Sequence, residues 1–165
     1  GKGAQKRSRN ATFGHKTLGE TTNFQLEKLL KNSKSFLGVF SHDTIPNISN
    51  KKKSSGIINL HTSEKEGSHW VCFFNDPKEP FIEYIDSFGV LPSSVIEQKL
   101  KLVKPKILYN SSQIQDLKSL NCGFFCYYYI KKRDNGTSPM DILLKFSKNT
   151  KKNDNILEKL LKNDI

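Results

Sequence analysis

The stretch LNCGFFCYYYI, residues 120–130, places two cysteines in an apolar, aromatic run, and Cys122 is the better placed of the two to act as a nucleophile. A helix is expected to begin close to Cys122, so its thiol would face unpaired backbone N–H groups and the positive end of the helix dipole. Such surroundings favour the nucleophilic thiolate. Gly123 leaves room for a substrate backbone to approach closely. Cys126 lies about one turn further along, and a free cysteine among aromatic residues is more often inert packing.

A nucleophilic cysteine needs a histidine base and a group that orients the base. Among the four histidines, His69 opens a predicted strand directly before Trp70, and Asp86 stands at the end of the next predicted strand. If these strands pair, both side chains reach the same edge of the sheet, where a carboxylate would fix the imidazole tautomer and stabilise the imidazolium. Taken singly, a histidine at a strand start and an acid at a strand end are more simply structural. The other three histidines have less suitable neighbours: His15, His42 and His61.

An oxyanion donor is expected among the residues that precede the cysteine. Gln115 stands seven residues before Cys122, and Gln113 lies two residues further away. A side-chain amide near the thiol could donate a hydrogen bond to a developing oxyanion, with the Cys122 backbone N–H as a second donor. Position in the chain does not choose between the two glutamines. No metal site is expected, because Cys122 and Cys126 have CxxxC spacing and a second pair of ligands is missing.

The elements that would position these residues alternate between helices and strands. Extended segments or strands are predicted over residues 35–47, 56–61, 69–75, 81–89 and 104–112. Helices are predicted over residues 24–33 and 92–103, from about Cys122 to residue 133, and over residues 140–148 and 155–163. This order predicts an α+β domain with a small mixed central sheet and helices packed around it.

Composition favours one domain with a polyanionic partner. The chain has 165 residues, enough for a single core, and its formal net charge is +11. Such a charge favours nucleic acid as a partner, although a merely solvated surface is an equally simple explanation. Residues 1–22 are basic and nearly devoid of apolar side chains, which predicts a flexible arm ahead of a single domain over residues 23–165. Three cysteines, with no disulfide framework, suit a reducing intracellular compartment, and no apolar run is long enough to span a membrane.

Three of these motifs together resemble a known family. The segments GSHW, YIDSFG and QDLKSLNCGFFC resemble the adenovirus-type maturation proteases, the adenain-like members of the superfamily that includes the SUMO-specific proteases. The separation of 17 residues between His69 and Asp86 is the family's usual spacing. The resemblance is strongest over residues 23–140, with C-terminal helices expected over residues 139–165. In its short length and its richness in Lys and Asn, the chain looks closest to the proteases of virophages and Polinton transposons.

The resemblance implies a papain-like or adenain-like cysteine protease fold with the nucleophile at a helix N-terminus. It assigns Cys122 as the nucleophile, His69 as the base and Asp86 as the group that orients His69. It also selects Gln115 over Gln113 as the oxyanion donor. Trp70 and Gly123 would line a narrow substrate groove that admits small residues, with glycine near the cut.

The function implied by the resemblance is that of a cysteine endopeptidase that cleaves capsid or core precursors at small-residue, Gly-containing sites during virion maturation. It would act as a monomer in the virion and the infected host cell. The sequence requires no cofactor, and DNA and an activating peptide are the two candidates. Two alternatives are a SUMO- or ubiquitin-like isopeptidase of the same superfamily and a non-enzymatic basic DNA-binding protein.

Overall fold

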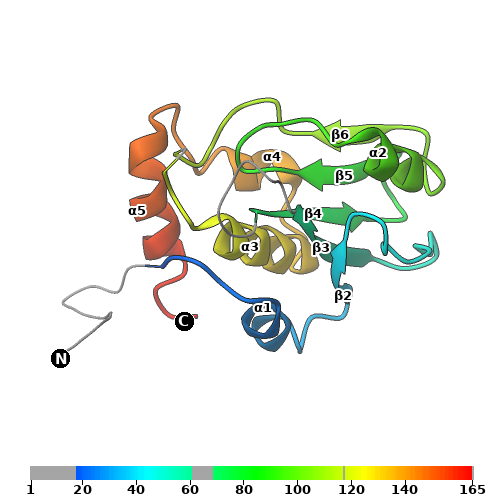
Figure 1. The fold of residues 1–165 in the computed structure, drawn as a ribbon, viewed down its shortest axis with the longest axis horizontal. Coiled ribbons are helices and arrows are strands. Elements are labelled where there is room, and N and C mark those ends of the chain that lie inside the picture. The colour runs from blue at the N-terminus through cyan, green and yellow to red at the C-terminus, as the bar shows by residue number, and fades with distance from the viewer. Residues whose placement is uncertain (1–17, 61–68, 117, 165) are drawn as a thin grey trace.

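The computed structural model describes residues 18–60, 69–116 and 118–164, which form a five-stranded sheet with helices on both faces (Figure 1). The strand order is β2-β3-β4-β5-β6. The strands are β2 (Phe36–Ser41), β3 (Ser54–Leu60), β4 (His69–Asn75), β5 (Ile82–Ile85) and β6 (Ile107–Tyr109). The two outer pairs, β2 with β3 and β5 with β6, are parallel, whereas β4 is antiparallel to both of its neighbours. The predicted α+β class with a small mixed sheet is therefore confirmed.

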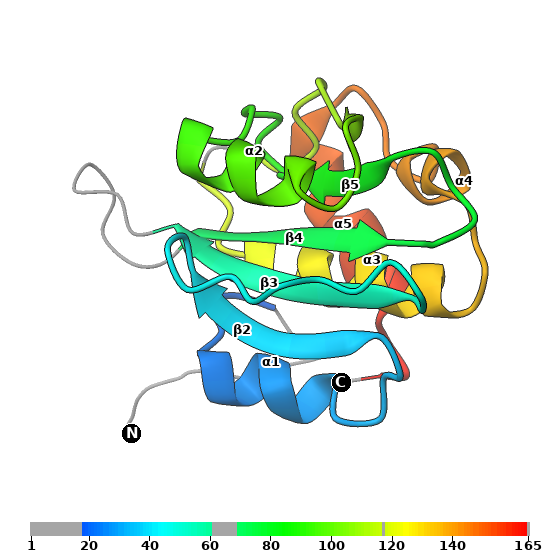
Figure 2. The same ribbon diagram turned by 90° about the vertical axis from the view of Figure 1, so that its right-hand side faces the viewer.

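Helices cover the two faces of the sheet unequally. The helices are α1 (Asn23–Leu29), α2 (Ser94–Lys101), α3 (Cys122–Asp134), α4 (Pro139–Leu143) and α5 (Thr150–Leu160). Figures 1 and 2 show α3 lying along one face of the sheet, with α1 and α5 beside it, and α2 on the opposite face. The larger core lies between the sheet and α3, and the smaller one lies under α2.

The central strand β4 is buried along its whole length. Its side chains alternate between the two cores: Cys72 and Phe74 face α3, whereas Val71 and Phe73 pack with the residues of α2. A strand covered on both faces reads as a continuous apolar run rather than an alternation of apolar and polar residues. This burial agrees with the largely apolar composition of HWVCFFN, the segment that was predicted as a strand.

Element ends differ from the predicted ones where pairing or capping decides them. Strand β3 begins at Ser54, two residues earlier than predicted, because Ser54 pairs with Asn75 of β4. Helix α5 begins at Thr150 rather than near residue 155, because the side chain of Asn149 accepts a hydrogen bond from the backbone N–H of Lys151. Strand β6 includes only three residues of the segment predicted over 104–112.

A buried ion pair fixes α3 against the sheet. The Arg133 Nε donates to Glu83 Oε1 at 2.8 Å, and Nη2 donates to Oε2 at 2.9 Å. The Tyr129 hydroxyl donates to the same Glu83 carboxylate at 2.6 Å. These contacts join the C-terminal half of α3 to β5, so they also determine where the helix N-terminus lies.

Several predicted features lie outside the described residues, namely His15, His61 and positions 1–17 of the predicted flexible arm. The last five residues of that arm, 18–22, are described and lie against the folded domain. Leu18 packs against the larger core, and the backbone N–H of Gly19 donates to Asn121 Oδ1 at 2.7 Å. The packed part of the chain therefore includes residues 18–22.

Candidate active site

Three element ends meet at one end of the sheet. Strand β4 begins there with His69, antiparallel β5 ends there directly before Asp86, and α3 begins there with Cys122 (Figure 1). The register that pairs Cys72 with Ile85 brings the residues after β5 beside the first residues of β4. The local sequence determines each helix and strand, and the pairing of the strands brings their ends together.

The structure brings His69, Asp86 and Cys122 together. The Nε2 atom of His69 lies 2.8 Å from Asp86 Oδ1, and the backbone N–H of the adjacent Trp70 donates to Cys122 Sγ at 3.4 Å. All three side chains are buried, with exposed fractions of 8% for His69, 2% for Asp86 and 5% for Cys122. Because Asp86 engages Nε2, Nδ1 is the ring nitrogen left for the thiol side, and it is buried without a hydrogen bond of its own among the described residues. This is the order of groups that thiol activation requires.

The imidazole of His69 is held in its protonated form. Burial lowers the pKa of His69, but the hydrogen bond to Asp86 and the interaction with Cys122, together with the charges of both groups, raise it by more, to about 9. An imidazolium beside a cysteine stabilises the thiolate. His69 therefore carries a positive charge beside Cys122 at neutral pH.

Two residues that the sequence did not single out as site residues hold Asp86 and His69 in place. The ring of Phe88 stacks on the His69 imidazole with the ring centres 4.6 Å apart, and its backbone N–H donates to Asp86 Oδ1 at 2.8 Å. Asn110, directly after β6, accepts from the Asp86 backbone N–H at 3.0 Å and donates to its carbonyl at 2.6 Å. A polar residue directly after a strand parallel to β5 was the signal for Asn110, since the ends of parallel neighbours share a sheet edge.

Gln115 is buried, whereas Gln113 is exposed. The Gln115 side-chain oxygen accepts from the hydroxyl of Ser87, the residue after Asp86, and its Nε2 donates to the Ser119 carbonyl at 2.7 Å. A side-chain amide has two N–H donors, so this bond to Ser119 uses one of them. Gln113 donates to the Gln115 carbonyl at 2.9 Å and so supports the backbone of the predicted oxyanion donor.

The N-terminus of α3 presents backbone N–H groups beside the thiol. Asn121 is the N-cap residue, but its side chain makes no capping hydrogen bond to the helix. Its Oδ1 accepts from Gly19 instead. The first N–H groups of a helix have no partner within the helix, so that of Cys122 is suited to stabilise negative charge nearby.

The other two cysteines lie in the core. Cys72 and Cys126 are 0% and 1% exposed. Burial and a hydrogen bond to Cys72 raise the pKa of the Cys126 thiol well above its usual range. A protonated, inaccessible thiol does not act as a nucleophile, and Cys126 is buried as the sequence predicted.

Gly123 allows a close contact beside Cys122. A Cβ atom added at Gly123 would lie 2.1 Å from Thr21 Oγ1 and 3.1 Å from Trp70 Cδ1. The first contact would displace Thr21, and the second would require the Trp70 ring to give by a few tenths of an ångström. The structure thus places Trp70 and Gly123 side by side, as the predicted groove requires, and adds Thr21 to them.

No metal centre and no membrane span emerge from the part of the chain that the structure describes. Within residues 18–60, 69–116 and 118–164, no three His, Cys, Asp or Glu residues gather so as to hold a metal ion. Across the same residues, every helix is too short or too polar to cross a bilayer.

Comparison with known proteins identifies similar viral proteins. No family model matches the sequence. A protein named "Protease" from Bovine adenovirus 7 is 28% identical in an alignment of 130 residues that covers 68% of this chain and 63% of the relative. The chain therefore spans less than two thirds of the length of that curated relative.

Solved structures share the fold. The ASFV pS273R protease superposes with a TM-score of 0.56 and 17% sequence identity over 86% of this chain and 66% of that protein. ChlaDub1 from Chlamydia trachomatis gives a TM-score of 0.50 and 16% identity over 68% of this chain and 59% of that protein. At these identities the similarity is one of fold: the described residues adopt the α+β architecture of these two proteins.

Proposed function

We propose that the chain is a cysteine endopeptidase with Cys122 as its nucleophile. The observation that carries the proposal is the buried contact of 2.8 Å between His69 and Asp86 at the N-terminus of the helix that begins with Cys122. The sequence similarity to the adenovirus protease and the fold shared with the ASFV protease support the proposal independently of the site geometry.

The reaction follows from the groups present. The Cys122 thiolate attacks the scissile carbonyl carbon and forms a C–S bond, while His69 gives its proton to the leaving amine as the C–N bond breaks. Neutral His69 then takes a proton from water, whose oxygen attacks the acyl carbon; the C–S bond breaks, the carboxylic acid leaves, and the Cys122 thiolate beside protonated His69 is restored. Asp86 holds the imidazole throughout. The Cys122 backbone N–H and the second N–H of the Gln115 amide would stabilise the oxyanion.

The proposed substrates are capsid or core precursor proteins cut at small-residue, Gly-containing sites. The close packing of Trp70, Thr21 and Gly123 supports a narrow groove beside Cys122, in which a residue without a side chain fits best. We place the activity in the virion and the infected cell and propose a monomer.

The test is cleavage of candidate capsid precursors by the purified chain, with Cys122→Ala as the inactive variant and Cys72→Ala as its matched control. We expect Cys122→Ala to lose activity by roughly 10⁴-fold or more and Cys72→Ala to retain it. Equal activity of Cys122→Ala and the parent would refute the mechanism. Cleavage of SUMO or ubiquitin fusions in preference to capsid precursors would favour the isopeptidase, and no cleavage at all would favour the DNA-binding protein.

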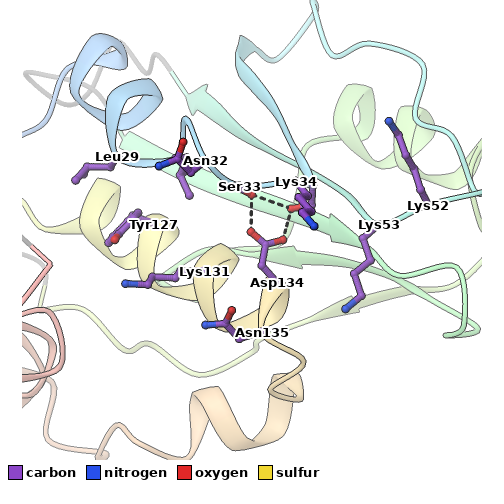
Figure 3. Close-up of a pocket in the computed structure, with 12 residues that line it drawn as sticks. Leu29, Asn32, Ser33, Lys34, Lys52, Lys53, Tyr127, Lys131, Asp134 and Asn135 are labelled. Carbon is purple, nitrogen blue, oxygen red and sulfur yellow. Dashed lines mark hydrogen bonds between the residues drawn. The ribbon is translucent and has the colours of Figure 1, made fainter.

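DNA is the proposed partner of the basic surface. A cavity lined by lysines, at the end of the sheet away from Cys122, supports this proposal. Lys34, Lys52, Lys53 and Lys131, here called the lysine cleft, line a cavity of about 830 Å³ between the starts of β2 and β3 and the C-terminal part of α3 (Figure 3). The carboxylate of Asp134 in this cavity accepts from the hydroxyls of Ser33 and Ser35. Phosphate attraction by such lysines needs no base sequence. An activating peptide remains the second proposed cofactor.

A further inference from the structure

A second cavity, of about 630 Å³, adjoins Trp70 on the side of the segment that precedes α1. Thr21 and Trp70 both line it, and the same two residues flank Gly123 beside Cys122. The cavity therefore opens next to the predicted nucleophile. The opposite wall is formed by the ends of β2 and β3, including Phe40 and Asn59.

Thr21 carries a hydroxyl group that lacks a protein partner. Its side chain is more than nine-tenths buried, with 7% of the residue exposed, and its Oγ1 makes no hydrogen bond within the described residues. The same atom lies against Gly123. Buried hydroxyls are nearly always hydrogen-bonded, so the unpaired Thr21 hydroxyl beside Gly123 can donate to or accept from an incoming group.

The charge of the cavity is opposite to that of the chain. Glu20 is the one charged residue among the described residues that line it, in a molecule whose formal net charge is +11. On the opposite wall, the hydroxyl of the lining residue Ser41 donates to the carboxylate of Asp43 at 2.7 Å, so a second negative group is bonded to a residue of the cavity wall. A local negative potential on a basic protein favours a cationic side chain.

We propose that this cavity, here called the Thr21 subsite, binds a basic side chain of the polypeptide substrate close to the scissile bond. The Thr21 hydroxyl hydrogen-bonds the substrate main chain next to Cys122, and Glu20 pairs with a lysine or arginine a few residues from the cut. The inference rests on the proposed protease function and adds a substrate class to it: extended polypeptides with glycine at the cut and a basic residue nearby.

The experiment uses the full chain and a library of internally quenched peptides. Each peptide carries glycine on both sides of the scissile bond and Lys, Gln or Glu at one of the three positions beyond each glycine. The parent should cleave the Lys peptides about tenfold more efficiently than the Glu peptides at one position, and Glu20→Gln should remove most of that preference. Glu27→Gln, an exposed change of equal charge on α1, is the matched control and should keep the preference.

The hydroxyl is tested by Thr21→Val and Thr21→Ser. Thr21→Val keeps the shape and should raise KM about tenfold with little change in kcat, whereas Thr21→Ser should stay near the parent. The same Thr21 changes are also made in the Cys122→Ala chain, and calorimetry measures how tightly each binds the best peptide. Thr21→Val should weaken this binding, whereas Thr21→Ser should not. Thermal melts show that each variant folds. An active enzyme with no Lys preference, or with equal KM for Thr21→Val and the parent, overturns the subsite. Cleavage that survives in Cys122→Ala overturns the proposed function instead.

Discussion

At the scale of single residues, the site depends on how Asp86 is held. Its carboxylate contacts the His69 ring at 2.8 Å and accepts from the Phe88 backbone N–H, while Asn110 binds both the N–H and the carbonyl of its main chain. The carboxylate is thereby fixed before a substrate arrives. Preorganisation of this kind lets a carboxylate set the orientation and the charge of a histidine without moving.

Replacing Asp86 by Asn should lower activity and shift its pH dependence. Cleavage should fall by roughly 10²- to 10⁴-fold, because the imidazolium loses its carboxylate. In the parent, the rate should decline on the alkaline side as His69 loses its proton near its pKa of about 9. Without the Asp86 charge the pKa of His69 is lower, so that decline should move to lower pH. A profile of kcat/KM between pH 5 and 10 measures both effects, and an unmoved alkaline limb would contradict the assignment.

The same pKa predicts how stability depends on pH. The pKa of His69 is raised above the ordinary value of 6.5, so its protonation stabilises the folded state fully below about pH 6.5. That stabilisation is lost as the pH rises through about 9. Asp86→Asn should therefore destabilise the chain more at pH 6 than at pH 9.5 in urea unfolding, while the exposed control Asp141→Asn should show no such difference.

At the scale of elements, α3 carries the site because the other half of the helix is anchored. Glu83 in β5 is fully buried, and it meets both Arg133 and Tyr129 near the end of α3. The guanidinium also stacks over the Phe74 ring, with 4.8 Å from Cζ to the ring centre. A helix anchored to the sheet in this way keeps its N-terminus, and so Cys122, at the edge where β4 begins.

Arg133→Met should destabilise the fold by about 3–5 kcal/mol, because it leaves the Glu83 carboxylate buried without its cation. The free energy of unfolding in urea measures this loss, and Lys132→Met on the same helix is the control. The double variant Glu83→Gln with Arg133→Met should lose less than Arg133→Met, since the fully buried Glu83 charge is removed together with its cation. A loss below about 1 kcal/mol for Arg133→Met would show that the ion pair does not hold the helix.

At the scale of the whole molecule, the two ends of the sheet carry different groups of side chains. The start of β4 and of α3 lies at one end with the catalytic candidates, whereas the lysine cleft lies at the other end, by the C-terminal part of α3. In the lysine cleft, Lys131 is paired with Asp164 at 2.7 Å, so Lys34, Lys52 and Lys53 supply most of its positive charge. A polyanion held there would leave the site at the opposite end open to a protein substrate.

If the lysine cleft binds DNA, changing Lys34, Lys52 and Lys53 to Gln should weaken binding more than an equal charge change elsewhere. The matched control is Lys106, Lys145 and Lys148, three exposed lysines on the side of β6 and α4, also changed to Gln. Fluorescence anisotropy with a duplex at several salt concentrations should show a smaller slope of log K against log salt for the cleft variant, by up to about 3. Equal slopes for the two triple variants would place the DNA elsewhere.

The sequence by itself determined which residue types the candidate site contains and the class of the fold. The apolar content of HWVCFFN and the helix that starts near Cys122 were readable because local periodicity and backbone preferences are properties of neighbouring residues. The spacing of His69, Asp86, Gln115 and Cys122, joined to a family resemblance, named the candidate site. The ends of β3, β6 and α5 were less readable, because pairing partners and the Asn149 cap decide them.

Only the tertiary structure decided which polar groups meet. Phe88 stacks on His69 and Asn110 binds the main chain of Asp86 because β5 lies between antiparallel β4 and parallel β6. Thr21, 101 positions before Cys122 in the chain, reaches the residue beside it because the segment before α1 crosses the start of α3. Contacts between residues so far apart depend on how the whole core packs, and no local pattern encodes them.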